Sequence, residues 1–192
     1  MPKIITCLTL LLVVSACAAT PDYSFNPATD GALVLVKTPK SLGGSVLLQE
    51  VDLQEEQFTN QLYVVRIGGI ASKHLRPPGD ERTRGELFAQ KVKPGKYAVV
   101  ARYPDGTTHV CFSRGTYVFE IQPGKVSIIP VQSNFLNPAE TIASAKELLK
   151  NYPNIVGKVV VPKPVARVTF DAFGFWSTCP SGKKLQVEKY YD

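Results

Sequence analysis

The chain has 192 residues and a formal net charge of +6, with 44% hydrophobic and 20% charged residues. This length suits a single domain with a sizeable hydrophobic core. The basic residues form neither a basic helix nor a stripe interleaved with aromatic side chains, which argues against nucleic-acid binding. The mild positive charge instead favours anionic neighbours such as lipid head groups or envelope polymers.

Residues 1–16 have the pattern of an export signal. Lys3 supplies a positive charge near the start, an apolar stretch covers 4–14, and Ser15 and Ala16 are small residues of the kind that precede a cleavage site. An apolar stretch of about ten residues is too short to cross a bilayer, which takes about twenty. We therefore predict a signal peptide at 1–16.

The stretch Val14-Ser15-Ala16-Cys17 resembles the lipobox of bacterial lipoproteins. The resemblance implies cleavage before Cys17 and fatty chains such as palmitate on its sulfur and amino group, and two chains suffice for stable anchoring. It also implies a lipoprotein of the cell envelope. Ala18 after the cysteine favours the periplasmic face of the outer membrane. The alternative is an ordinary secretory signal cut near Ala18 or Ala19, which would discard Cys17 or leave it as a free thiol.

Residues 17–30 are predicted to form a lipidated flexible tether. They are small and polar, and Pro21 and Pro27 interrupt them. A coil of this length spans about 20 Å on average, which would hold the domain close to the membrane. Residues 31–192 then form one domain.

From Ala32 onward, short apolar runs alternate with turn residues. The run 32–36 is apolar throughout, which predicts a strand buried on both faces. Pro162 and Pro164 confine their segment to a sheet edge or a bulge. Strands of this length at regular spacing predict an antiparallel sandwich or barrel. We expect strands at 32–36, 46–48, 62–67, 86–92, 97–103, 107–112, 117–121, 126–131, 155–161, 166–170 and 185–188.

Two Pro-Gly pairs are predicted to close hairpins. Pro94-Gly95 lies between the expected strands 86–92 and 97–103, and Pro123-Gly124 lies between 117–121 and 126–131. Proline presets φ at the first central position of a type II turn, and glycine accepts the positive φ that the second position requires.

One helix is expected at about 138–151. Asn137 can cap it, Pro138 suits its first turn, and Pro153 ends it. The apolar residues at helical spacing are Ile142, Ala145, Leu148, Leu149 and Tyr152. We expect this face to cover a sheet edge or the open end of a barrel.

The stretch 92–99, which reads Val-Lys-Pro-Gly-Lys-Tyr-Ala-Val, is similar to a signature of carboxypeptidase-regulatory-like domains of the prealbumin type. Residues 117–126 are similar to a repeated feature of an uncharacterised family of bacterial lipoproteins with such a domain. The resemblance covers roughly residues 32–133. It implies a mostly β, antiparallel immunoglobulin-like or prealbumin-like sandwich, with the helix in the C-terminal half as an addition. It implies no catalytic residues.

Two of the four cysteines remain after export and lipidation. Cys7 leaves with the signal and Cys17 carries lipid, so Cys111 and Cys179 are left. In an oxidising compartment such a pair is expected to form a disulfide. The alternative makes Cys111 a nucleophile or a metal ligand, with His109 on the same strand face and His74 as a further ligand.

Two groups of residues are candidate binding surfaces. Arg76, Arg82 and Arg84 lie in a charged, proline-rich loop, which is either simply solvated or a contact for phosphate or carboxylate groups. Phe173, Phe175 and Trp176 follow Phe170. Exposed, this aromatic group could stack on sugar rings or meet a protein partner, and buried, it would pack in the core or around the disulfide.

No coherent set of catalytic residues is evident. Ser181 and Lys184 match the Ser-x-x-Lys spacing of penicillin-recognising enzymes, but the companion motifs of those enzymes are missing. We therefore expect a non-enzymatic, lipid-anchored envelope protein without cofactor or metal. It would serve as a binding or structural module whose partner is another envelope component, either a protein or peptidoglycan. The first alternative is a carbohydrate- or peptidoglycan-binding module that uses the C-terminal aromatic residues. The second is a small metal-dependent or hydrolytic enzyme that uses His109.

Overall fold

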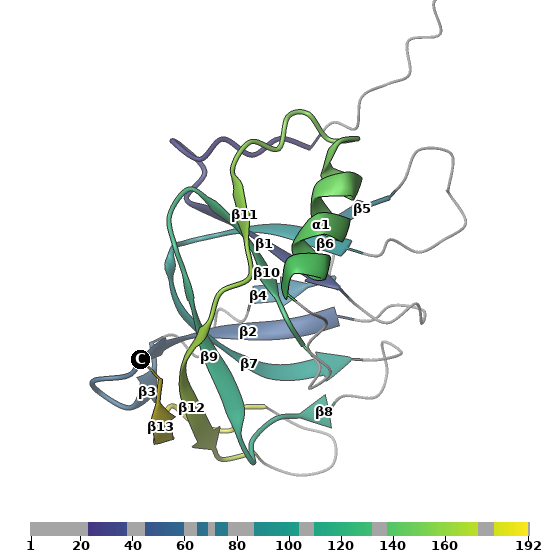
Figure 1. Ribbon diagram of the computed structural model, residues 1–192. Coiled ribbons are helices and arrows are strands. Elements are labelled where there is room, and N and C mark those ends of the chain that lie inside the picture. The colour runs from purple at the N-terminus through teal and green to yellow at the C-terminus, as the bar shows by residue number, and fades with distance from the viewer. Residues whose placement is uncertain are drawn as a thin grey trace, which may run out of the picture.

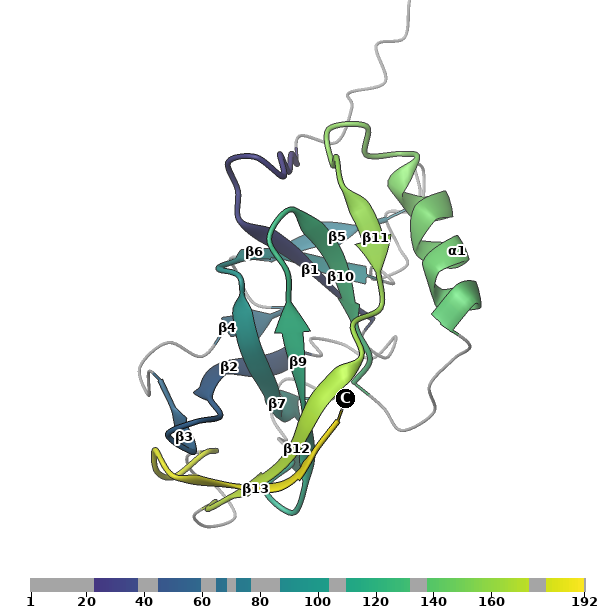
Figure 2. The same ribbon diagram turned by 60° about the vertical axis from the view of Figure 1, so that its left-hand side comes forward.

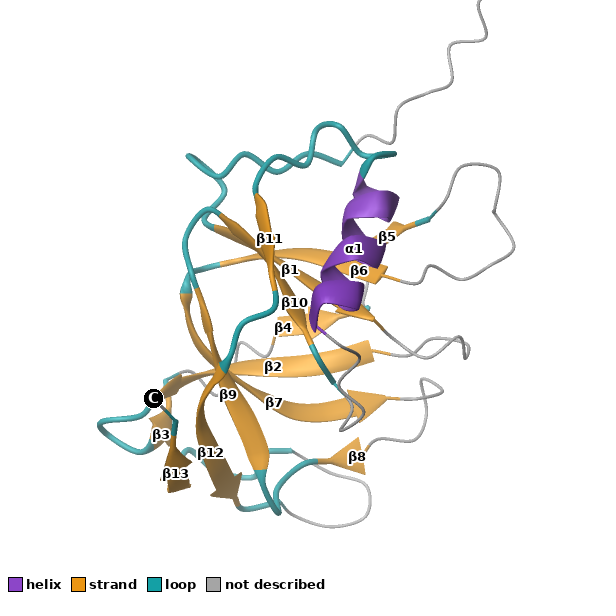
Figure 3. Ribbon diagram, in the orientation of Figure 1, coloured by secondary structure: helices purple, strands orange, loops and turns teal. Residues whose placement is uncertain are grey.

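The structure is a computed structural model that describes residues 23–37, 45–59, 65–68, 72–76, 87–103, 110–131, 138–172 and 179–191. These ranges are mostly strand, with one helix among them (Figure 3). The elements in chain order are β1 (Ala32–Lys37), β2 (Ser45–Asp52), β3 (Gln57–Phe58), β4 (Val65–Ile67), β5 (Lys73–Leu75), β6 (Leu87–Val92), β7 (Gly95–Tyr103), β8 (Val110–Cys111), β9 (Thr116–Ile121), β10 (Lys125–Ile129), α1 (Pro138–Leu149), β11 (Lys158–Val160), β12 (Pro164–Phe170) and β13 (Leu185–Tyr190).

The strands form two sheets. The five-stranded sheet has the order β11-β10-β1-β6-β5. Its β1–β6 and β5–β6 pairs are antiparallel, whereas β1–β10 and β10–β11 are parallel. The eight-stranded sheet has the order β13-β12-β9-β7-β2-β3, with β4 paired to β2 and β8 to β7, and its strand pairs are antiparallel. The expected mostly β class with two packed sheets and one helix is confirmed.

The eight-stranded sheet curls until its two outer strands meet. The amide of Phe58 in β3 donates to the carbonyl of Lys183 at 2.8 Å, and the amide of Leu185 donates to the carbonyl of Glu56 at 3.0 Å. These bonds join β3 to the start of β13, so the sheet becomes a near-barrel. Pairing also removes the exposed edges that would otherwise attract another chain.

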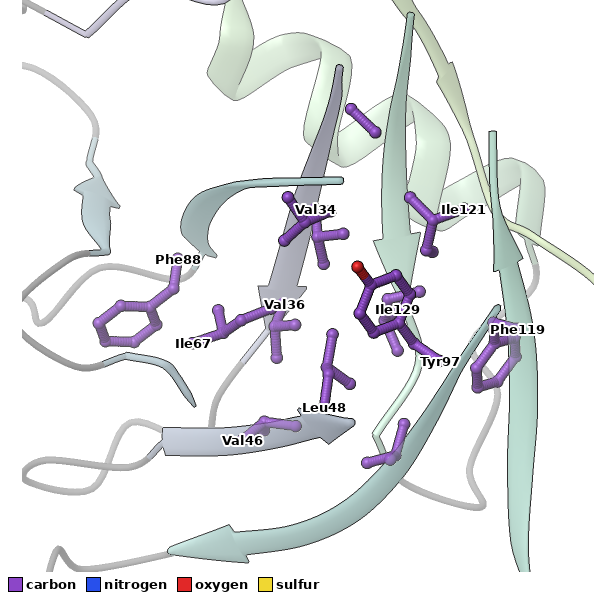
Figure 4. Packing of buried hydrophobic residues seen from close by; sticks show 13 residues of the cluster. Val34, Val36, Val46, Leu48, Ile67, Phe88, Tyr97, Phe119, Ile121 and Ile129 are labelled. Atoms are coloured by element: carbon purple, nitrogen blue, oxygen red, sulfur yellow. The ribbon is translucent and has the colours of Figure 1, made fainter. Parts of the chain in front are cut away.

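The two sheets and α1 lie in layers (Figures 1 and 2). Three clusters of buried apolar side chains accompany this arrangement. The first lies between the two sheets and includes Val34 and Val36 of β1, Leu48 of β2 and Phe119 of β9 (Figure 4). The second lies between the five-stranded sheet and α1, and the third fills the near-barrel with side chains such as Val100. Each fully buried large apolar side chain contributes about 2 kcal/mol.

β1 shows why its sequence is apolar throughout. Val34 and Val36 point into the first cluster, while Leu33 and Leu35 point toward α1 in the second. The strand is covered on both faces, as predicted from its sequence.

α1 forms where the sequence predicts it. Ala145 is buried, and Ile142, Leu148 and Leu149 pack against the second cluster, so the predicted apolar face covers the five-stranded sheet. The helix ends at Leu149, two residues before the expected end. Its predicted cap, Asn137, lies outside the described residues.

Both predicted hairpins are wrong. β6 belongs to the five-stranded sheet and β7 to the other, and likewise β10 and β9 lie in different sheets. Each Pro-Gly pair therefore carries the chain across the interface between the sheets. Gly124 has a φ of 67°, as a type II turn requires, but Gly95 does not have a positive φ and instead begins β7.

The structure confirms one further detail of the predicted strands and changes two others. Pro164 opens β12 at a register shift in the pairing with β9, which confirms the expected edge or bulge. β3 was not predicted, and its pairing with β2 and β13 depends on long-range contacts. Lys73–Leu75, where no strand was expected, is strand β5 and pairs with β6.

Candidate functional site

The residues nearest Cys17 that the structure describes are Tyr23–Asp30, and they pack on the domain. The side chain of Phe25 is fully buried in the second cluster. Its amide donates to the carbonyl of Asn154 at 2.8 Å, and the amide of Val156 donates to the carbonyl of Phe25 at 2.9 Å. The predicted tether over 17–30 is therefore corrected, because its last eight residues belong to the folded domain.

Asp30 closes this N-terminal segment and joins it to β6. The amide of Asn26 donates to the Asp30 carboxylate at 2.8 Å, and Lys91 forms an ion pair with the same carboxylate at 2.9 Å. The hydrogen bond from Asn26 and then that from Lys91 hold the pKa of Asp30 below its usual value. Burial raises the pKa of nearby Tyr23 to about 12, so its phenol stays neutral at physiological pH.

Cys111 and Cys179 form the expected disulfide. The bridge links β8 to the segment before β13 across 68 residues of sequence. Cys111 therefore has no thiolate to act as nucleophile or metal ligand, which overturns that alternative for this residue. His109 lies outside the described residues, and the part of the chain that is described holds no group of three or more metal-ligating side chains.

Arg76 lies beside the end of α1 and is half-buried there. Its amide donates to the Tyr152 hydroxyl at 2.7 Å, and that hydroxyl lies 3.2 Å from the Arg76 carbonyl, to which it donates. The guanidinium lies 3.2 Å from Nδ1 of His74, whose ring meets Phe88 edge-on at 3.9 Å between centroids. These contacts fasten the chain after α1 to the end of β5.

The remaining candidate residues fall on parts of the chain that the structure does not describe. Arg82 and Arg84 lie outside the described residues, so the predicted anion contact of Arg76, Arg82 and Arg84 stays a prediction. The same holds for Phe173, Phe175 and Trp176.

The structure does describe Phe170, which precedes these aromatic residues in the sequence. It is buried in the third cluster, where its ring meets Phe58 edge-on at 5.5 Å. For this residue core packing is confirmed.

An aromatic pair at the surface, with one ring exposed and the other partly buried, was missed from the sequence. Tyr117 of β9 is 38% exposed, and its ring lies 6.1 Å from that of Tyr191 after β13. Lys189 places its ammonium 5.1 Å from the Tyr191 ring. Tyr117 and Phe119 are two residues apart and lie on the same face of β9, yet only Phe119 is buried. Alternation along a strand shows which residues share a face. It does not show that the facing sheet leaves the start of β9, where Tyr117 lies, uncovered.

Comparison of the chain with protein-family models, with curated proteins and with solved structures finds no match in any of the three. Within the described ranges, no helix has the length and apolar character needed to cross a bilayer.

Proposed function

We propose that this protein is a bacterial lipoprotein held in the cell envelope by acyl chains on Cys17. Its β domain is a non-enzymatic binding or structural module, placed at the periplasmic face of the outer membrane. The observation that carries the proposal is Val14-Ser15-Ala16-Cys17 at the end of a short apolar stretch, six residues before the packed Tyr23. The resemblance to prealbumin-type domains of such lipoproteins forms part of the same proposal.

Two structural features support export. The Cys111–Cys179 bridge is of the kind that persists in oxidising compartments such as the bacterial periplasm. The packed segment Tyr23–Asp30 also follows Cys17 closely, so a domain attached through that residue would lie near its anchor. Two fatty chains would then anchor it stably.

Radiolabelled palmitate tests the anchor. We expect the native chain to incorporate label and to fractionate with membranes, and Cys17→Ser to lose both. Cys7→Ser is the matched control, because it changes another cysteine of the leader and should change neither readout. An unlabelled native chain, or a Cys17→Ser variant still bound to membranes, would contradict the proposal.

A second candidate function is binding of carbohydrate, including peptidoglycan. It is favoured by the surface pair of Tyr117, which is exposed, and Tyr191, which is partly buried and contacts Lys189, because aromatic faces stack on sugar rings. Phe173, Phe175 and Trp176 are the further aromatic residues that the sequence suggests for it.

A pull-down with purified sacculi tests this function. We expect Tyr191→Ala and Trp176→Ala to weaken binding, whereas Val156→Ala, at an exposed apolar residue elsewhere, leaves it unchanged. Equal binding by all of these variants would count against the carbohydrate function. Crosslinking in intact cells would then test for a protein partner.

A further inference from the structure

The link between Cys17 and the folded domain is short. Five residues separate Cys17 from Tyr23, which is the first residue that the structure describes. A chain of that length reaches at most about 20 Å even when fully extended. If acyl chains hold Cys17 at the lipid surface, the part of the domain that carries Tyr23 must lie near that surface.

That part of the domain has a defined orientation because Tyr23–Asp30 is fastened at several points. Phe25 is buried and hydrogen-bonded to the loop before β11, and Asp30 is paired with Lys91. We name the surface formed by Tyr23–Asp30, residues 153–158 and Lys125 the attachment end. Figures 1 and 2 both show it at the end of the molecule opposite β3 and β13.

The attachment end presents an apolar side chain with lysines beside it. Val156 is 57% exposed, although its amide is held by Phe25. Lys158 follows two residues later, and Lys125 lies opposite it in the β10–β11 register. Neither lysine forms an ion pair with another described residue, whereas Asp30 of the same end is paired with Lys91.

We infer that the attachment end rests on the bilayer and that its ligand is an anionic phospholipid surface. The inference deepens the proposed function and rests on it. Val156 would lie among the head groups, where an apolar side chain gains by leaving water, and Lys125 and Lys158 would face lipid phosphates. The opposite end, with β13 and the exposed Tyr190, then points away from the membrane and stays available to a partner.

Tryptophan quenching by brominated phospholipids tests this orientation. The single native tryptophan is first replaced by Trp176→Phe, and Val156→Trp or Tyr190→Trp is added as reporter. Both reporter sites are more than half exposed, so either substitution should leave the core intact. The acylated chain is reconstituted into vesicles of phosphatidylethanolamine and phosphatidylglycerol with brominated acyl chains.

We expect loss of fluorescence in the Val156→Trp protein and none in the Tyr190→Trp protein. Mass spectrometry of the same samples reports whether Cys17 carries acyl chains. Acylated protein without quenching at position 156, or with equal quenching at both positions, overturns the orientation alone. Protein without acyl chains overturns the proposed function and the orientation with it.

Charge reversal tests the part played by the lysines. A lysine near an anionic surface favours contact by about fivefold. We therefore expect Lys125→Glu with Lys158→Glu to reduce quenching in the Val156→Trp protein severalfold. The matched control is Lys183→Glu with Lys184→Glu, which changes the net charge equally at two exposed lysines of the opposite end. Equal loss in both double variants would show that net charge, and not the attachment end, governs contact.

Discussion

Phe25 shows how much one residue can change the interpretation of a segment. It lies among small polar residues and prolines, so local composition predicts a flexible tether. The structure buries its ring in the second cluster, where no atom of it reaches solvent. A single aromatic side chain in a buried pocket outweighs the polar character of its neighbours.

We predict that Phe25→Ala lowers the free energy of unfolding by about 3–5 kcal/mol, because it removes a buried ring and leaves a cavity. Urea denaturation followed by circular dichroism measures the change. Ser24→Ala, at the exposed neighbouring position, should stay within about 0.5 kcal/mol of the native protein. A loss below about 1 kcal/mol in Phe25→Ala would show that the segment is not docked.

Asp30 makes the docking of the same segment dependent on pH. The pKa of the Asp30 carboxyl is lower in the folded protein than its ordinary value of 3.8. The ionised carboxylate therefore stabilises the fold at pH values above 3.8. This contribution is lost as the pH falls through the lower, folded pKa.

We predict that Asp30→Asn lowers the Tm at neutral pH, and that the difference from the native protein shrinks once the pH falls below 3.8. Asparagine keeps an oxygen that can accept from the Asn26 amide but cannot form the ion pair with Lys91. Thermal unfolding across the acid range measures the effect. A difference in Tm that persists unchanged at the acid end would contradict the role of the charge.

At the scale of elements, the Pro123-Gly124 turn connects the two sheets. Gly124 has a φ of 67°, and its amide donates to the carbonyl of Gly31. A Cβ there would lie 3.2 Å from Cβ of Pro27, which belongs to the docked N-terminal segment. The turn, β1 and the N-terminal segment therefore meet at one crowded point.

We predict that Gly124→Ala destabilises the protein by about 1–2 kcal/mol, because an L side chain disfavours this left-handed backbone. Gly182→Ala is the control, since a Cβ at Gly182 would have no neighbour within 4 Å and its φ is not positive. Chemical denaturation compares the two variants. Equal stabilities would contradict the strain argument.

For the whole molecule, the Cys111–Cys179 bridge spans much of the second half of the chain. It ties β8, at the side of β7, to the segment that leads into the barrel-closing strand β13. Because it encloses a long loop, it restricts the unfolded chain strongly.

We predict that the double change Cys111→Ser and Cys179→Ser lowers the free energy of unfolding by about 4 kcal/mol, as the chain-entropy relation gives for a loop of this length. A reductant should lower the stability of the native protein to a similar level and leave the double variant unchanged. Denaturation with and without reductant measures both effects. A loss below about 1 kcal/mol would show that the bridge contributes little to the fold.

Local patterns in the sequence were sufficient to predict the β class, the doubly buried β1, the helix with its apolar face, and the disulfide. Each depends on spacing along the chain or, for Cys111 and Cys179, on elimination within a small set of cysteines.

Only the tertiary structure decided which strands pair. A Pro-Gly turn reverses the chain equally well within one sheet or between two, so the residues around Gly95 and Gly124 cannot distinguish a hairpin from a crossing. β3 has only two residues and acquires its place from partners in β2 and β13, and Phe25 acquires its burial from the chain after α1. Such contacts join segments far apart in sequence. They stabilise the fold only after the chain has closed the loops between these segments, which costs conformational entropy that no local sequence pattern records.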